Sequence, residues 1–186
     1  FMEWSQSLRG YILHPLLKIL SKLGLTASHI TFLSLLAGLA FCPLFIWTDK
    51  LIAFAFLLLH VLLDGLDGPL ARFQGTSSNR GSFTDTMVDQ IVVTVTAITM
   101  IQAQHAGIWA GSLYIFFYAI VVVFAFVRNA LDSPYSWLFR PRFIVFGWFI
   151  IDTYWWEGSL DWVLSIAASI LALKALTGFF SIRKRI

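Results

Sequence analysis

Apolar residues occur along this chain in long runs that are separated by short polar breaks. A helix needs about 20 predominantly apolar residues to cross the hydrocarbon core of a bilayer, and six segments come near that length. These segments cover residues 28–47, 50–72, 80–103, 107–129, 138–155 and 159–182. The pattern therefore predicts an all-α polytopic membrane protein with six transmembrane helices, of which the fifth is the shortest.

The segment before the first run, residues 3–20, has a different pattern. Apolar and aromatic side chains recur there at helical spacing, while charged and polar residues occupy the other faces. The apolar positions are Trp4, Leu8, Tyr11, Ile12 and Leu16. Because this segment is too polar to span a bilayer, it predicts an amphipathic helix that lies at the membrane interface.

Composition supports the membrane assignment. The 186 residues are 59% hydrophobic and only 12% charged, about half the charged fraction of an average soluble domain. At this length the six predicted spans use nearly every residue, so we expect one domain over residues 1–186, with the helix bundle at 28–182. Cys42 is the one cysteine, which excludes an intramolecular disulfide. The N-terminus lacks a short apolar core followed by a small-residue cleavage site, so we expect no signal peptide.

The basic residues predict the orientation. Six spans would place eleven of the thirteen Lys and Arg residues on one side of the membrane. These eleven are Arg9, Lys18, Lys22, Arg72, Arg80, Arg128, Arg140, Arg142, Arg183, Lys184 and Arg185. Lys50 would lie on the other side, and Lys174 falls inside the last span, where we expect it to snorkel to the surface. By the positive-inside rule both termini should be cytoplasmic.

Four carboxylates fall inside or at the edge of predicted spans: Asp64, Asp67, Asp85 and Asp89. Each would cost about 2.5–3.5 kcal/mol at the centre of an inserting helix, so some interaction must compensate. The first pair is spaced i, i+3 and the second i, i+4, which puts each pair on one face of its helix. Two antiparallel helices could bring all four together, and divalent cations would relieve their repulsion. All-oxygen ligation favours Mg²⁺, Mn²⁺ or Ca²⁺.

Small and basic residues accompany these acids. Small residues near the carboxylates let a bulky group approach the helix backbone, and they are Gly65, Gly68, Ala71, Gly75 and Gly81. Arg72 and Arg80 lie at the predicted membrane edge, where a guanidinium can pair with phosphate oxygens. Together these features indicate phosphoryl chemistry at a membrane surface.

The stretch from Asp64 to Asp89 also resembles a known signature. It begins Asp-Gly-Leu-Asp-Gly-Pro-Leu-Ala-Arg and continues with eight residues, Gly81, three residues, Asp85, three residues and Asp89. This resembles the CDP-alcohol phosphotransferase signature D-x2-D-G-x2-A-R-x8-G-x3-D-x3-D at all eight specified positions and every spacing. Residues 25–31 also look like this family's entry to its first span, although Ala-Ser stands where Pro-Asn is usual.

The resemblance implies a role for each matched residue. Asp64, Asp67 and Asp85 would hold two Mg²⁺ or Mn²⁺ ions against a pyrophosphate, with Ca²⁺ as a substitute or inhibitor. Asp89 would contact the second ion and act as general base on an alcohol. The nucleotide would be lined by Gly68, Ala71, Arg72 and Gly81. The implied catalytic domain transfers a substituted phosphate group from a CDP-linked donor to the alcohol and releases CMP.

The substrates stay open at this point. The short chain favours CDP-diacylglycerol as donor and a small polar alcohol as acceptor, with CDP-choline or CDP-ethanolamine plus diacylglycerol as the alternative. Gln90 stands where some branches of the family place a basic residue, which puts the acceptor in doubt. Arg128, Arg140 and Arg142 could bind a phosphorylated acceptor, or only set the topology. Pro69 should bend its helix.

Other function classes remain as alternatives. A metal-ion transporter would distribute acids across the membrane depth, whereas these acids cluster toward one side. An inactive homologue would have little reason to keep all four. His60, one turn before Asp64, is expected to hydrogen-bond within the bundle. By resemblance we expect a homodimer. The small size of the chain suggests a prokaryotic cytoplasmic membrane, and the basic residues suggest a cytoplasmic active site. We also expect lipid contacts and no nucleic-acid partner.

Overall fold

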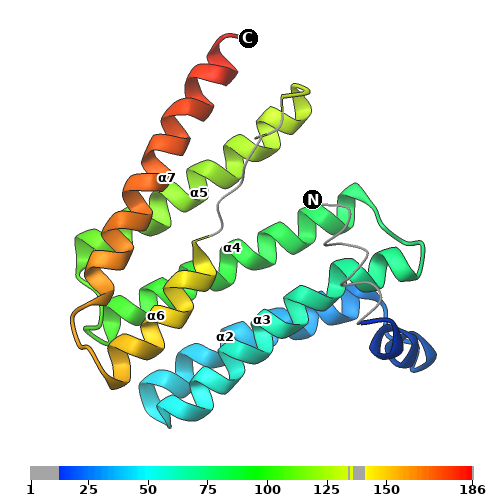
Figure 1. The fold of residues 1–186 in the computed structure, drawn as a ribbon, viewed down its shortest axis with the longest axis horizontal. Helices are drawn as coiled ribbons and strands as arrows, with labels where there is room; N and C mark the ends of the chain where they lie inside the picture. The colour runs from blue at the N-terminus through cyan, green and yellow to red at the C-terminus, as the bar shows by residue number, and fades with distance from the viewer. Residues whose placement is uncertain (1–12, 134, 136–140, 186) are drawn as a thin grey trace. The chain divides into compact units, whose positions relative to one another are not determined.

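The computed structural model describes residues 13–133, 135 and 141–185, and every regular element among them is a helix. Residues 13–22 form the first helix that it describes. Six longer elements follow: α2 (Ala27–Trp47), α3 (Lys50–Phe73), α4 (Asn79–Gln102), α5 (Ile108–Ala130), α6 (Arg142–Tyr154) and α7 (Leu160–Arg183) (Figure 1). The predicted all-helical polytopic membrane class is confirmed.

Five of these helices are long and apolar enough to cross a membrane, and they are α2, α3, α4, α5 and α7. Among the six longer elements the exception is α6, whose 13 residues extend about 20 Å, short of the roughly 30 Å hydrocarbon core. The predicted fifth span, residues 138–155, begins outside the described residues. The count of six spans therefore stays a prediction.

A short connection joins α3 to α4, the two consecutive helices that carry the four aspartates. α3 continues through Pro69 and ends at Phe73, with Gln74 as its C-terminal cap. Gly75 follows with φ +67°, a left-handed conformation that glycine adopts without steric cost. Five residues thus separate the helices, which is short enough for an antiparallel pair.

The chain divides into two compact units. The first comprises residues 1–44 and Asp49–Asp89, and the second comprises Phe45–Thr48 and Gln90–Ile186. The single-domain organisation of residues 1–186 stays a prediction.

In the first unit, the helix of residues 13–22 packs against α2 and α3 through its apolar face. Leu17 is buried with Ile30 of α2 and Leu70 of α3. Gln74 Nε2 donates a hydrogen bond to the Leu25 carbonyl at 2.8 Å. The amphipathic helix predicted over residues 3–20 is therefore present where the structure describes it, and it packs against the end of α3 that precedes the turn.

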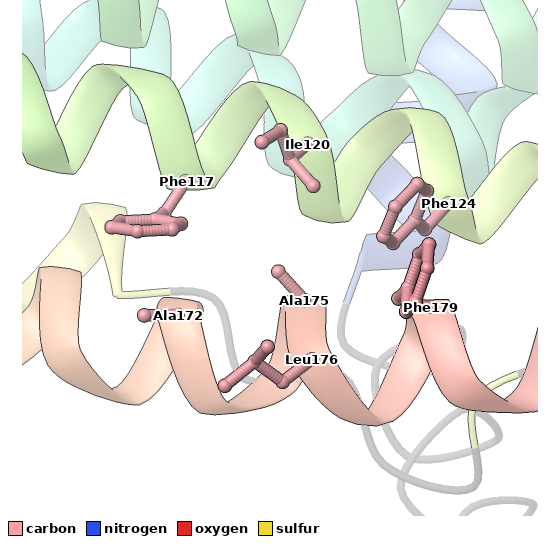
Figure 2. A pocket seen from close by; sticks show the side chains of 7 residues that line it. All are labelled: Phe117, Ile120, Phe124, Ala172, Ala175, Leu176 and Phe179. Carbon is pink, nitrogen blue, oxygen red and sulfur yellow. The ribbon is translucent and has the colours of Figure 1, made fainter.

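In the second unit, α5 and α7 lie side by side, and α6 packs on α7 (Figure 1). A groove of about 270 Å³ lies between α5 and α7, and Figure 2 shows the side chains that line it. Its lining is wholly apolar and consists of Phe117, Ile120, Phe124, Ala172, Ala175, Leu176 and Phe179. Such a groove suits helices that contact lipid hydrocarbon.

A buried polar network ties two turns of the second unit together. The Asp152 carboxylate, 1% exposed, lies 2.7 Å from His105 Nδ1 and accepts a hydrogen bond from the Leu160 backbone N–H at 2.9 Å. The Ser159 hydroxyl lies 3.4 Å from the same carboxylate and accepts from Trp148 Nε1 at 2.9 Å. Because Leu160 is the first residue of α7, Asp152 serves as a cap supplied by α6.

Candidate functional site

The four predicted carboxylates lie on two consecutive helices of the first unit. Asp64 and Asp67 are on α3, within the last three turns of that helix, and Asp85 and Asp89 are on the first half of α4. Residues three or four apart share a helix face, so each helix presents its pair together. The helix assignments place each pair on one helix, and the roles of the four acids stay a prediction.

Three of the acids meet closely enough to share a cation. Asp64, Asp85 and Asp89 each offer a carboxylate oxygen, and these three oxygens all lie within 4.8 Å of one another. Asp89 is buried, whereas the other two are half-buried. Hard divalent cations take oxygen ligands at about 2.0–2.6 Å, so oxygens on opposite sides of one ion are about 4–5 Å apart. The donor chemistry and the spacing of these residues therefore fit Mg²⁺ or Mn²⁺.

Asp67 lies three residues after Asp64 on α3 but is not among the three acids that meet, and it is held from α2. Its side chain is buried. The Thr31 hydroxyl donates to Asp67 Oδ2 at 2.8 Å, and the Gly68 backbone N–H donates to Oδ1 at 2.6 Å. Both oxygens of Asp67 thus have a protein donor.

His60 lies one turn before Asp64 and does hydrogen-bond within the helix bundle, as predicted. Its Nδ1 is 2.8 Å from Ser34 Oγ on α2, and the Ser34 hydroxyl is 3.1 Å from the His60 carbonyl oxygen. The histidine ring is 1% exposed.

The residues predicted to line a nucleotide lie around the ends of α3 and α4. The Arg72 side chain is exposed and folds back over Gly68, where an added Cβ would lie 3.6 Å from Arg72 Nη1. Ala71 is half-buried, and Gly81 is exposed with its N–H donating to Ser78 Oγ at 3.1 Å. Their small side chains keep this surface open, and their contact with a nucleotide stays a prediction.

The structure describes two of the three predicted acceptor-binding arginines. Arg128, near the end of α5, donates from Nε to the Ser133 carbonyl at 2.8 Å. Arg142 begins α6 and is 1% exposed, with its guanidinium 4.7 Å from the centre of the Phe143 ring. Arg140 lies outside the described residues. Whether these cations bind an acceptor stays a prediction.

Lys174 does not snorkel to the surface, so that prediction was wrong. It is buried in α7, and its Nζ lies 5.0 Å from the centre of the Tyr135 ring. Arg128 stacks on the same ring at 4.2 Å, and the Tyr135 hydroxyl donates to the Lys174 carbonyl at 3.4 Å. Burial raises the pKa of the Tyr135 hydroxyl above its ordinary value, so the ring that both cations contact is neutral at physiological pH.

Sequence reasoning missed Tyr135 and misplaced Lys174 because a loop residue reaches back onto the helix. One signal was present in the chain. Gly178 lies one turn after Lys174, and a Cβ there would collide with the Tyr135 hydroxyl. Gly178, one turn after Lys174 in α7, thus leaves the space that the Tyr135 side chain occupies.

Comparison with known proteins gives a consistent result. A family model described as CDP-alcohol phosphatidyltransferase matches residues 24–179. CDP-diacylglycerol–serine O-phosphatidyltransferases of Mycobacterium bovis and Mycobacterium tuberculosis are 31% identical over 113 residues. That match covers 60% of this chain and 40% of the relatives, so the chain spans less than half of their length.

Solved structures share the fold over nearly the whole chain. A crystal structure of Mycobacterium tuberculosis phosphatidylinositol phosphate synthase with CDP-DAG bound is similar with a TM-score of 0.79 at 19% identity. The similarity covers 92% of this chain and 94% of that one. The same enzyme in complex with manganese and citrate gives a TM-score of 0.76 at 20% identity, covering 90% and 87%. At this identity the likeness concerns the fold.

Proposed function

Because this chain belongs to the CDP-alcohol phosphatidyltransferase family, we propose that it transfers a phosphatidyl group from CDP-diacylglycerol to a polar alcohol and releases CMP. The observation that carries the proposal is the meeting of Asp64, Asp85 and Asp89 at the ends of two apolar helices. Four like charges at a membrane edge need cations, and a diphosphate substrate needs the same cations. The names of the similar proteins support the CDP-diacylglycerol branch over the CDP-choline type.

In this proposal Asp64, Asp67, Asp85 and Asp89 hold two Mg²⁺ or Mn²⁺ ions. When bound, the ions neutralise the diphosphate and make CMP a better leaving group. Asp89 takes the proton of the acceptor hydroxyl. The alcohol oxygen then forms a bond to the phosphorus distal to cytidine, and the bond from that phosphorus to the CMP oxygen breaks with its electron pair on CMP.

Residues around the acids would bind the donor. Gly68, Ala71 and Gly81 have no side chain or a small one, so that cytidine can approach the helix backbone. The Arg72 side chain, exposed and folded over Gly68, is able to turn its guanidinium toward a phosphate oxygen of the donor.

The acceptor site would lie among the basic residues of the second unit. Arg128, Arg140 and Arg142 are the proposed ligands, and the position of Lys174 beside Arg128 on the Tyr135 ring adds a further cation. Arg128 and Lys174 contact one ring, and two neighbouring cations favour an anionic partner because the anion offsets their mutual repulsion. This arrangement supports a phosphorylated alcohol, although the serine-directed relatives keep a neutral-headed acceptor such as serine open.

We extend the proposal to the setting of the enzyme. The basic residues at both ends of the chain support cytoplasmic termini and a cytoplasmic active site in a prokaryotic membrane. A homodimer, carried over from the family, completes the proposal.

The test is CMP release from CDP-diacylglycerol by purified protein with Mn²⁺ or Mg²⁺, across a panel that includes serine, inositol phosphate and glycerol 3-phosphate. Asp89→Asn should lower the rate at least about 100-fold, since it removes the general base. Asp49→Asn is the matched control, because Asp49 caps α3 and asparagine caps equally well. If folded protein consumes no CDP-linked donor with any acceptor, the proposal fails.

A further inference from the structure

Two hydroxyl groups of α2 each hold one polar side chain of α3. The Thr31 hydroxyl donates to Asp67 at 2.8 Å, and one turn further Ser34 Oγ contacts His60 Nδ1 at 2.8 Å. All four side chains are buried, with exposures between 1% and 7%. In a low-dielectric span such contacts are costly to lose. The two contacts differ in one respect: the Thr31 hydroxyl contacts Asp67, which is one of the four predicted metal ligands, whereas the Ser34 hydroxyl contacts a histidine.

The Asp67 carboxylate is fixed in rotation by its two donors. Oδ1 accepts from the N–H of Gly68, which belongs to the rigid backbone of α3, and Oδ2 accepts from Thr31 on a different helix. A carboxylate held at both oxygens presents its remaining lone pairs in one direction. Asp64, one of the three acids that meet, lies one turn earlier on the same face of α3.

We propose that Thr31 is a positioning residue, which orients Asp67 toward the divalent cations without touching them or the substrate. The inference rests on the proposed metal site. Residues that hydrogen-bond a metal-ligating carboxylate fix its orientation and raise affinity for the metal. Thr31 Oγ1 also lies 3.0 Å from the Ala27 carbonyl oxygen, but a hydroxyl carries one hydrogen, and the shorter contact, with Asp67, takes it. The branched Cβ of Thr31 restricts its χ1 angle, which holds the hydroxyl in the conformation that reaches Asp67.

The inference is tested by Mn²⁺ binding, followed through the electron paramagnetic resonance signal of free aqueous Mn²⁺, in purified protein without substrate. Thr31→Val keeps the shape and removes the donor, and it should weaken Mn²⁺ binding about 10-fold or more. Thr31→Ser restores a hydroxyl and should restore binding to near the wild-type level. Ser34→Ala removes the neighbouring hydroxyl, which serves His60, and should leave Mn²⁺ affinity unchanged while it lowers thermal stability.

The outcomes separate this inference from the proposed function. If wild-type protein binds Mn²⁺ and Thr31→Val binds it as tightly, the positioning role is refuted and the metal site stands. If Ser34→Ala weakens binding as much as Thr31→Val, loosening of the α2–α3 contact explains both, and the role is refuted as well. If folded wild-type protein binds no Mn²⁺, the metal site itself fails and Thr31 has nothing to position. Should the valine variant not fold, Thr31→Ala tests the same loss with a smaller side chain.

Discussion

Replacing Asp152 with alanine should destabilise the protein without altering the chemistry of the folded enzyme. The carboxylate is 1% exposed and lies 2.7 Å from His105 and 2.9 Å from the backbone nitrogen of Leu160. Alanine would leave that buried N–H without an acceptor and would remove a hydrogen bond from His105. These two groups belong to different turns, so the substitution also severs the tie between them.

The magnitude follows from those contacts. A buried donor left unsatisfied costs about 1–3 kcal/mol, and a hydrogen bond to a charged group contributes about 1.5–3 kcal/mol. The bond from Ser159, at 3.4 Å, is long and adds little. We therefore expect a loss of about 3 kcal/mol in the free energy of unfolding. For a chain of this size that corresponds to a fall in Tm of about 6–12 °C.

The assay is thermal unfolding of the purified protein in detergent, followed by tryptophan fluorescence, together with CMP release per folded molecule at a temperature below both transitions. Asp161→Ala is the matched control. Asp161 accepts a hydrogen bond from the Gly107 N–H at 2.6 Å but is solvent-accessible, so its loss should cost about 1 kcal/mol or less. Asp152→Asn keeps an acceptor for Leu160 and should fall between Asp152→Ala and wild type.

The reasoning would be refuted if Asp152→Ala lowered Tm no more than Asp161→Ala does. That result would mean that water or a rearranged turn satisfies the Leu160 N–H at no cost. A large loss of activity in the folded variant would contradict the assignment of a purely structural role.

Two further predictions concern the contact of Tyr135 with Lys174 and the N-terminal helix. Gly178→Ala places a Cβ against the Tyr135 hydroxyl and 3.0 Å from Phe124, so the tyrosine should move away from Lys174. We expect KM for an anionic acceptor to rise about tenfold, equivalent to about 1.4 kcal/mol, with kcat little changed. An unchanged KM would mean that the acceptor binds elsewhere. Leu17→Ala removes a buried side chain at a cost of about 2–5 kcal/mol, and amide hydrogen exchange over residues 13–22 should speed up selectively. Uniform exchange rates in that variant would show that the helix is held by other contacts.

Much of the helical layout is local in origin and was therefore predictable. The predicted span 50–72 is observed as Lys50–Phe73, because a continuous apolar run fixes the length of a membrane helix. The predicted 80–103 span corresponds to Asn79–Gln102 for the same reason. The 138–155 segment is the exception, since its described helix has only 13 residues. An apolar run sets where a span is possible, but it does not show how much of the run is helical.

Within the candidate site, the sequence predicts which acids share a helix face, whereas tertiary structure sets the distances between the helices' acids. Helical periodicity alone puts Asp64 with Asp67 and Asp85 with Asp89, since residues three or four apart share a face. The approach of Asp64 to Asp85 and Asp89 depends on how the chain turns between α3 and α4, which helical periodicity does not fix. The hydrogen bond from Thr31 to Asp67 joins residues 36 positions apart, and no spacing rule connects them.

The sequence by itself determined the membrane class, the positions of most helices and the identity of the acidic cluster, because each follows from hydropathy or from the repeat of one helix. Tertiary structure alone decided which buried polar groups meet. His105 contacts Asp152, which lies 47 positions later in the sequence. Lys174 is buried where Tyr135, from a loop distant in sequence, packs on it. A buried charge or donor is stable only with a partner, and that partner is chosen by the packing of whole helices.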